Sequence, residues 1–295
     1  MTQSHNTDRA IKARPPYLRA LGAADPPEQI EVGAEIFHRI EIYKHDSWAA
    51  TALYQSASRK VVCKFNRRQR LFVIPMSWLG RRLAKRESRF LDALSDLENV
   101  PNPVGPVSVE GKILANAAAH DYVEGRPVGD EERVNDDFFP KLEQTLAVLH
   151  ERGIAYIDLH KSENILVGLD GSPHLIDFQA SYMRPKSRVL ARLTRRLERM
   201  LQELDSYHLK KHLTLKRPDI AGYTWDEFNQ RNERPEWIKL HRKLATPFRM
   251  FRRKLLVLLG VRKNQGFVDS EHFPEAAVRL RHVSSDAVSK ARKAA

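Results

Sequence analysis

Several features that would place a protein in a special class are missing from this sequence of 295 residues. Cys63 is the only cysteine, which excludes an internal disulfide and a cysteine-based zinc site. No run of about 18 apolar residues could span a bilayer, and residues 1–20 lack the apolar centre of a signal peptide. We therefore expect a cytoplasmic protein.

Positive charge, in contrast, is abundant and concentrated in one region. The chain carries 50 Lys or Arg against 37 Asp or Glu, a formal net charge of +13. Residues 184–263 hold 22 of the basic and only 8 of the acidic side chains, which accounts for the whole excess. Such a segment suits an anionic partner, and a solvated helical face is the alternative. It contains no aromatic-interleaved motif that would predict a specific nucleic-acid partner.

The order of the predicted elements indicates an α+β protein. Paired prolines and weak periodicity predict a flexible arm over residues 1–30, and a flexible tail is predicted over residues 271–295. Alternating apolar residues predict an antiparallel meander of three strands, at residues 35–43, 49–55 and 60–66. Apolar spacing predicts long helices at residues 78–97 and 137–153, the second ending at Gly153. The remainder of the chain is predicted to be mostly helical.

Acidic and amide side chains gather around a predicted hairpin. Residues 165–167 and 174–176 form two short apolar strands, and Asp170-Gly171 between them is a strong turn pair. A two-residue turn there places Asn164 opposite Asp177, whose oxygens are of the kind that Mg²⁺ prefers. Asp158 in the preceding loop could accept a proton from an attacking hydroxyl. The alternative is that these residues only cap the turn.

A lysine and a glutamate are each predicted to point inward. Glu87 lies on the apolar stripe of its helix with Leu83 and Leu91, and Lys64 shares a strand face with Val62. A buried carboxylate needs a cationic partner, so the two predict an ion pair. The alternative is that both reach solvent separately.

In this order, Lys64, Glu87, "DLHKSEN" and "IDF" resemble the signature set of protein-kinase-like proteins. The chain is similar to atypical bacterial kinases near the lipopolysaccharide core (heptose or Kdo) kinases and the RIO-type kinases, over about residues 35–210. The resemblance implies a bilobal protein-kinase-like fold. A small antiparallel-sheet N-lobe would cover residues 31–119, and a mainly helical C-lobe residues 120–270.

The resemblance also implies a role for each site residue. Lys64, paired with Glu87, would hold the α- and β-phosphates of ATP, and Asp158 would be the catalytic base. Asn164 and Asp177 would hold Mg²⁺. The backbone of "HDYVEG", at Tyr122 and Val123, would bind adenine. His160 is predicted to contact the γ-phosphate, and a loop histidine bonded to backbone is the alternative.

Two departures from the family pattern are expected to change the local structure. The segment "KHDSWAAT", in the place of a Gly-rich loop, contains no glycine, although Ser47, Ala49 and Ala50 are small enough for phosphates to approach the backbone. The interval from Asp158 to Asn164 is one residue longer than usual, so that loop must bulge.

The predicted activity is transfer of a phosphoryl group from ATP, with Mg²⁺, to a hydroxyl. The preferred acceptor is a small-molecule or lipid-linked sugar of the lipopolysaccharide-core type, with a protein Ser or Thr second. A pseudokinase that binds nucleotide or serves as a scaffold is the alternative. Residues 246–263 combine apolar and basic residues, which predicts peripheral contact with the anionic inner membrane. Packing of that segment on the core is the alternative.

Overall fold

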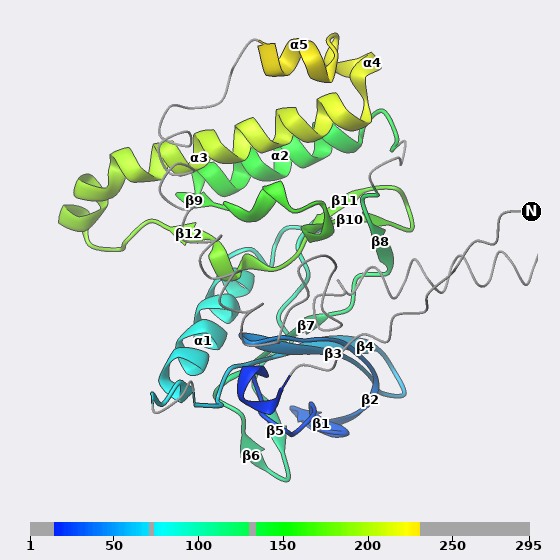
Figure 1. Cartoon of the computed structure of the whole chain (residues 1–295), viewed down its shortest axis with the longest axis vertical. Coiled ribbons are helices and arrows are strands. Elements are labelled where there is room, and N and C mark those ends of the chain that lie inside the picture. The colour runs from blue at the N-terminus through cyan, green and yellow to red at the C-terminus, as the bar shows by residue number, and fades with distance from the viewer. Residues whose placement is uncertain (1–14, 71–73, 130–133, 231–295) are drawn as a thin grey trace, which may run out of the picture.

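The computed structural model describes residues 15–70, 74–129 and 134–230. In this part of the chain, a seven-stranded sheet and helix α1 (Ser77–Ala93) form one side of the molecule, and the remaining helices form the other (Figure 1). The sheet is antiparallel throughout, in the order β6-β5-β1-β2-β3-β4-β7. Its strands are β1 (Gln29–Val32), β2 (Glu35–His45), β3 (Ala49–Gln55), β4 (Lys60–Asn66), β5 (Val107–Val109), β6 (Lys112–Ile113) and β7 (Ala117–Asp121).

The predicted meander is confirmed as β2, β3 and β4. The alternation along β4 buries Val61, Cys63 and Phe65 in the core of the sheet. The residues between them, Val62 and Lys64, therefore point to the opposite face, toward the helical part.

Residues 15–30, predicted as part of a flexible arm, form ordered structure instead. They contain the 3-10 helix η1 (Pro16–Leu18) and the start of β1, and they bury Ala20 and Leu21. The paired prolines in this segment predicted flexibility and gave no sign that these two side chains are buried against the sheet. Residues 1–14 and the predicted tail 271–295 lie outside the described residues.

Both long helices occur where the apolar spacing predicts them. Helix α1 begins one residue before the predicted range 78–97 and ends within it, and α2 (Phe138–Glu151) lies within 137–153. Gly153 follows α2 with φ at 70°, a conformation that favours glycine. The face of α2 that carries Leu142, Leu146 and Leu149 is buried in the core of the helical part.

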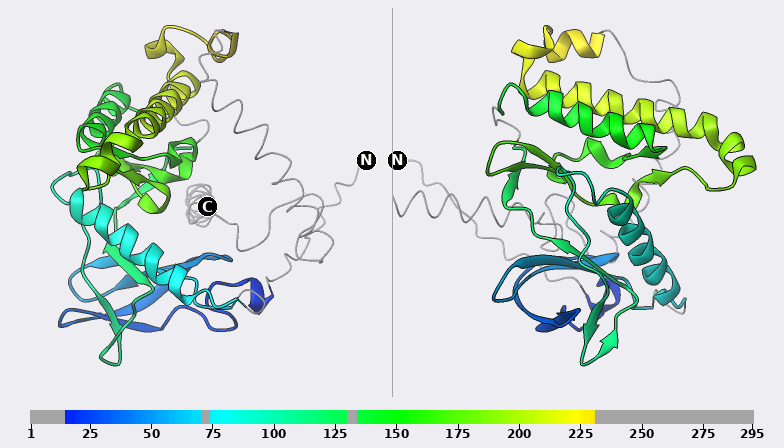
Figure 2. Two further views of the ribbon diagram at one scale, coloured as in Figure 1. Left: turned by 90° about the vertical axis from the view of Figure 1, so that its left-hand side faces the viewer. Right: turned by 180° about the vertical axis from the view of Figure 1, so that it is seen from behind.

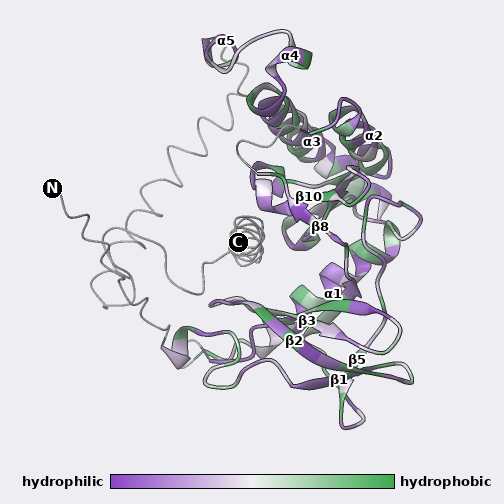
Figure 3. Cartoon of the chain, turned by 90° about the vertical axis from the view of Figure 1, so that its right-hand side faces the viewer, coloured by the Kyte–Doolittle hydropathy of each residue, from purple (hydrophilic) through white to green (hydrophobic). Residues whose placement is uncertain are grey.

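Short strands and one long helix complete the described fold. A three-stranded sheet has the order β11-β10-β8, and β12 pairs with β9. In the side view of Figure 3, β8 and β10 lie between the large sheet and helices α2 and α3. The bounds are β8 (Gly125–Pro127), β9 (Ile154–Ala155), β10 (Ile165–Gly168), β11 (Pro173–Leu175), β12 (Tyr182–Met183), α3 (Arg188–Lys216), α4 (Pro218–Ala221) and α5 (Trp225–Gln230).

The α+β class is therefore confirmed: an antiparallel sheet occupies the N-terminal part, and helices α2 to α5 dominate the rest of the described chain (Figure 2). Of the predicted C-lobe, residues 231–270 lie outside the described residues, and the segment 246–263 lies there as well. Within the described part, no helix is both long enough and apolar enough to cross a bilayer.

Candidate active site

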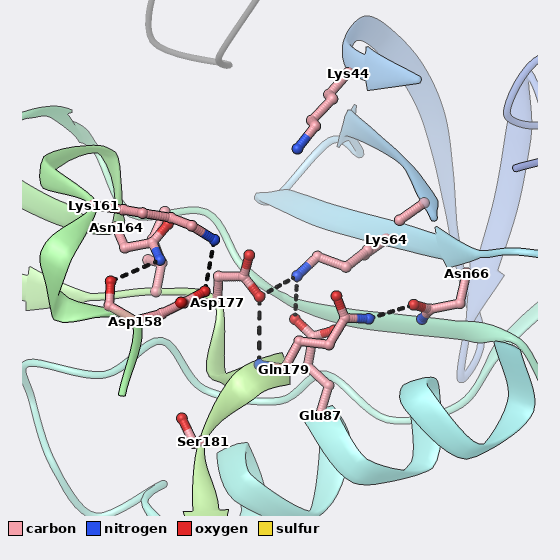
Figure 4. A network of polar contacts seen from close by, with 12 residues as sticks. Lys44, Lys64, Asn66, Glu87, Asp158, Lys161, Asn164, Asp177, Gln179 and Ser181 are labelled. Atoms are coloured by element: carbon pink, nitrogen blue, oxygen red, sulfur yellow. Dashed lines mark hydrogen bonds and ion pairs between the residues drawn. The ribbon is translucent and has the colours of Figure 1, made fainter. Parts of the chain in front are cut away.

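A cavity of about 570 Å³ lies between the large sheet and the helical part. Most of the predicted site residues line it, although they come from distant parts of the chain: Ala49, Lys64, Tyr122, Val123, Asp158, Asn164 and Asp177. Glu87 reaches the same cluster from α1 through its contact with Lys64 (Figure 4). Ser47 and His160 are not among the lining residues.

Lys64 is the centre of this cluster. Its ammonium donates a hydrogen bond to Glu87 Oε1 at 2.8 Å and another to Asp177 Oδ1 at 2.8 Å. The predicted ion pair with Glu87 is thus present, and a second carboxylate, 113 residues along the chain from the lysine, completes it. The lysine joins the sheet, α1 and the loop that holds Asp177.

Burial and charge act in opposite directions on these three groups. Burial raises the pKa of Glu87, since the carboxylate is almost fully enclosed. Burial alone would lower the pKa of Lys64, but the charges of Asp177 and Glu87 raise it. Burial would raise the pKa of Asp177, yet Lys64 lowers it to about 2. Lys64 and Asp177 are therefore charged at neutral pH.

Asp158 lies in a loop built from two consecutive 3-10 helices, η2 (Asp158–His160) and η3 (Ser162–Asn164). This double turn is how the chain accommodates the extra residue of the interval from Asp158 to Asn164. The Asn164 side chain donates to the backbone oxygen of Asp158 at 3.5 Å. The loop thereby places an acidic and an amide side chain on the same cavity wall.

The predicted cross-strand pairing of Asn164 with Asp177 is wrong by one residue. In the observed register Ile165 pairs with Leu175, and the Ile176 amide donates to the Asn164 backbone oxygen at 3.1 Å. The hairpin has a three-residue loop that ends at Gly171 with φ at 79°, rather than the two-residue turn. Asn164 and Asp177 nevertheless line the same cavity, where Asp177 adopts a φ of 61°.

Lys161, which no sequence pattern singled out, takes the position expected for His160. Lys161 lines the cavity and donates to Asp158 Oδ2 at 2.6 Å, whereas the His160 side chain is 49% exposed. Burial alone would lower the pKa of Lys161, but the hydrogen bond to Asp158 raises it. Residues three apart lie on one side of a 3-10 helix, so a 3-10 prediction for "DLHK" could have identified this pair.

A second missed residue, Asp205 on α3, holds the loop before Asp158. Its fully buried carboxylate accepts hydrogen bonds from the amides of Tyr156 and Ile157, at 2.7 and 2.6 Å, and contacts His150 Nε2 at 3.1 Å. Ile157 has a φ of 72°, a region that a β-branched residue rarely adopts. Asp205 therefore stabilises a strained turn directly before the candidate base.

The segment without glycine is held by hydrogen bonds from Asp46 and by contacts with the N-terminal residues. Asp46 Oδ1 accepts hydrogen bonds from the amides of Trp48 and Ala49, at 2.6 and 2.9 Å. The Ala20 amide donates to the Asp46 backbone oxygen at 2.7 Å. The Ser47 hydroxyl donates to the Leu18 backbone oxygen at 2.8 Å, and Ser47 does not line the cavity. Of the three small residues named for this segment, Ser47, Ala49 and Ala50, only Ala49 lines the cavity.

Arg67 joins this segment to the N-terminal residues. The side chain is buried and donates to the backbone oxygens of Ser47 at 2.7 Å, Tyr17 at 2.9 Å and Arg70 at 3.0 Å. We expect Arg67→Ala to lower the free energy of unfolding by about 2–4 kcal/mol, because a buried side chain and its hydrogen bonds to three carbonyls are lost. Urea unfolding measures this loss. The neighbouring Arg68 is exposed, and Arg68→Ala should change the value by less than about 0.5 kcal/mol. Equal losses in the two variants would contradict the assigned role of Arg67.

The proposed adenine position is partly constrained by the sheet. The Tyr122 amide donates to the Lys60 backbone oxygen at 3.1 Å, so this N–H is engaged in strand pairing. The neighbouring His120 also lines the cavity, and burial lowers its pKa to about 4. The His120 side chain is therefore uncharged at neutral pH.

The side-chain oxygens of Asp177 and Asn164 in the cavity are of the kind that suits a magnesium ion. The contacts of Asp177 with Lys64 and Gln179 use Oδ1, which leaves Oδ2 for a metal (Figure 4). The Asn164 side-chain oxygen is the second candidate ligand. In the described part of the chain no three His, Cys, Asp or Glu residues gather as a metal site. Two protein ligands completed by water and phosphate oxygens are what Mg²⁺ commonly uses.

Comparisons with known proteins add a structural similarity at low identity. No family model matches the chain, and no curated protein matches it. The crystal structure of the Rio2 kinase from Chaetomium thermophilum is similar at 17% identity and a TM-score of 0.43, over 66% of this chain and 57% of that one. The ADP/Mg²⁺-phosphoaspartate complex of the same kinase is similar at 18% identity and 0.43, over 64% and 55%. The chain thus matches little more than half the length of these structures.

Proposed function

We propose that this protein has a bilobal protein-kinase-like fold and transfers the γ-phosphoryl group of ATP, with Mg²⁺, to a hydroxyl. The observation that carries the proposal is the position of Lys64 between Glu87 and Asp177, in a cavity that Asp158 and Asn164 also line. A mostly buried, charged lysine beside a carboxylate that could bind a metal provides the positive charge that nucleotide phosphates need.

Each residue has one proposed task in this reaction. Lys64 binds the α- and β-phosphates, and the backbone at Tyr122 and Val123 binds adenine. Asn164 and Asp177 would hold Mg²⁺, which would neutralise the negative charge that develops on the phosphates. Asp158 accepts the proton of the attacking hydroxyl. Lys161 donates a hydrogen bond to Asp158, and from this position beside the proposed base it contacts the transferred phosphoryl group as well.

A small-molecule or lipid-linked sugar of the lipopolysaccharide-core type is the preferred acceptor, and a protein Ser or Thr is second. After η4 (Phe178–Ala180) the chain passes through β12 and enters α3 at Arg188. This short connection supplies little surface on which an extended peptide could lie, which favours a compact acceptor. Contact of residues 246–263 with an anionic inner membrane remains part of this proposal.

Labelled ATP tests the proposed function directly. The purified protein is incubated with γ-labelled ATP, Mg²⁺ and the lipid, sugar and protein fractions of a bacterial cell. We expect label in the sugar or lipid fraction, and a rise in melting temperature with Mg-ATP. A thermal shift without label in any fraction favours the pseudokinase, which binds nucleotide without transfer. If there is no label in any fraction and no thermal shift with Mg-ATP, both the kinase and the pseudokinase are refuted.

A further inference from the structure

The N-terminal half of α3 exposes an unusual number of large apolar side chains. Val189, Leu190, Leu193 and Leu197 are 71%, 52%, 74% and 46% exposed. At 100° per residue they fall within an arc of about 100°, which runs about 12 Å along the helix. In Figures 1 and 2 this end of α3 projects beyond the other described elements.

Arginines cover the adjacent arc of the same helix. Arg192, Arg195, Arg196 and Arg199 follow the apolar stripe along its length, and all four are exposed. Residues 184–199 contain six Lys or Arg besides Arg184 and a single acidic residue, Glu198. That glutamate is buried and accepts hydrogen bonds from Arg184 Nε at 3.1 and 2.8 Å. The exposed face therefore carries only positive charge beside apolar surface.

The third arc of the helix attaches it to the protein. Besides the Arg184–Glu198 pair, the Tyr182 hydroxyl donates to Thr194 Oγ1 at 2.9 Å, and the Arg184 amide donates to the Gly153 backbone oxygen at 2.8 Å. The helix is thus held in a defined orientation, with its leucines and arginines directed outward together.

We propose that this face of α3, formed by the exposed residues of the segment 188–199, binds the surface of an anionic lipid bilayer. The leucines would enter the boundary between headgroups and acyl chains, and the arginines would contact lipid phosphates at the same depth. This surface is separate from residues 246–263, and the proposal does not depend on the proposed kinase activity.

The chemistry of the face favours lipid over the other anionic partners. A nucleic acid would pair with the arginines but leave Val189 and the three leucines exposed to water. A second copy of the same face would bring two sets of arginines together, which is unfavourable. A bilayer with anionic headgroups satisfies both halves of the face at once, because apolar and negatively charged layers lie within a few ångströms of each other.

Co-sedimentation of the full chain with vesicles tests the proposal. We expect binding to vesicles of phosphatidylcholine with phosphatidylglycerol, and little binding to phosphatidylcholine alone. Leu193→Ser/Leu197→Ser should weaken binding on the order of tenfold, since less apolar area enters the interface. Arg192→Gln/Arg196→Gln should weaken it by a similar factor and reduce its salt dependence. Leu169→Ser is the matched control, because Leu169 is 80% exposed in the β10–β11 loop and should not affect binding.

Four results would overturn the proposal. The first is absent vesicle binding, or binding that neither double variant changes. The second is a dimer in light scattering that the leucine variant dissociates, since the face would then contact a second copy. The third is RNA binding that the arginine variant loses and the leucine variant keeps. The last is a melting temperature several degrees lower in the leucine variant, because the face would then pack on another part of the chain.

Discussion

Asp158→Asn is expected to reduce the rate of phosphoryl transfer by about 10³-fold, because an amide cannot accept the proton of the attacking hydroxyl. The substitution keeps an oxygen that can pair with Lys161, and it leaves untouched the backbone oxygen that Asn164 contacts. Binding of Mg-ATP should therefore change by less than about threefold. Initial rates of label transfer and calorimetric titration with Mg-ATP measure the two quantities.

His160→Asn is the matched control for this prediction. His160 is two residues from Asp158, with its ring nitrogen 3.7 Å from the carboxylate, yet it does not line the cavity. Its replacement should leave the rate within about threefold of the wild type. A loss in His160→Asn as large as that in Asp158→Asn would restore the histidine to the site and contradict the observed geometry.

Asp205→Ala is expected to have the largest effect on stability, a loss of about 3–5 kcal/mol in the free energy of unfolding. Its carboxylate is fully buried, and its removal leaves the amides of Tyr156 and Ile157 without an acceptor. The strained turn at Ile157 would also lose the contact that holds it. Urea unfolding followed by circular dichroism gives the value.

Two further variants separate the role of Asp205 from general damage to α3. Asp205→Asn retains one oxygen acceptor, so we expect a loss smaller than in Asp205→Ala and, at a temperature where it is folded, slower transfer with unchanged Mg-ATP affinity. Glu203→Ala removes an exposed carboxylate from the same helix and should cost less than about 0.5 kcal/mol. Equal losses in Glu203→Ala and Asp205→Ala would show that the helix, rather than the hydrogen bonds, is responsible.

Local periodicity was sufficient for much of the fold. The alternation along residues 49–55 and 60–66 predicted β3 and β4 with the observed bounds, because a strand with one buried face must alternate. The apolar spacing of α1 placed Glu87 inward, and a buried carboxylate requires a cation. Those two facts were enough to pair Glu87 with Lys64, which lies on the strand that precedes α1.

Loop geometry was predictable only in part. The short strands around Asp170-Gly171 indicated a hairpin, but sequence did not distinguish a two-residue turn from a three-residue loop that ends in a left-handed glycine. In "DLHK" the sequence likewise did not show which side chain lies beside Asp158. The 3-10 geometry places Lys161 there, rather than His160. In both cases a shift of one residue changes which side chain enters the cavity.

By itself, then, the sequence determined the α+β class, the main strands and helices, and the inward lysine and glutamate, since all of these depend on the spacing of neighbouring residues. Only the tertiary structure decided which distant groups support the site. Asp205 reaches the Tyr156 amide across 49 residues, and Arg67 reaches the Tyr17 carbonyl across 50. Such contacts depend on how whole elements pack, because a hydrogen bond between them forms only when both backbones are already in place, and no periodicity in the sequence records that.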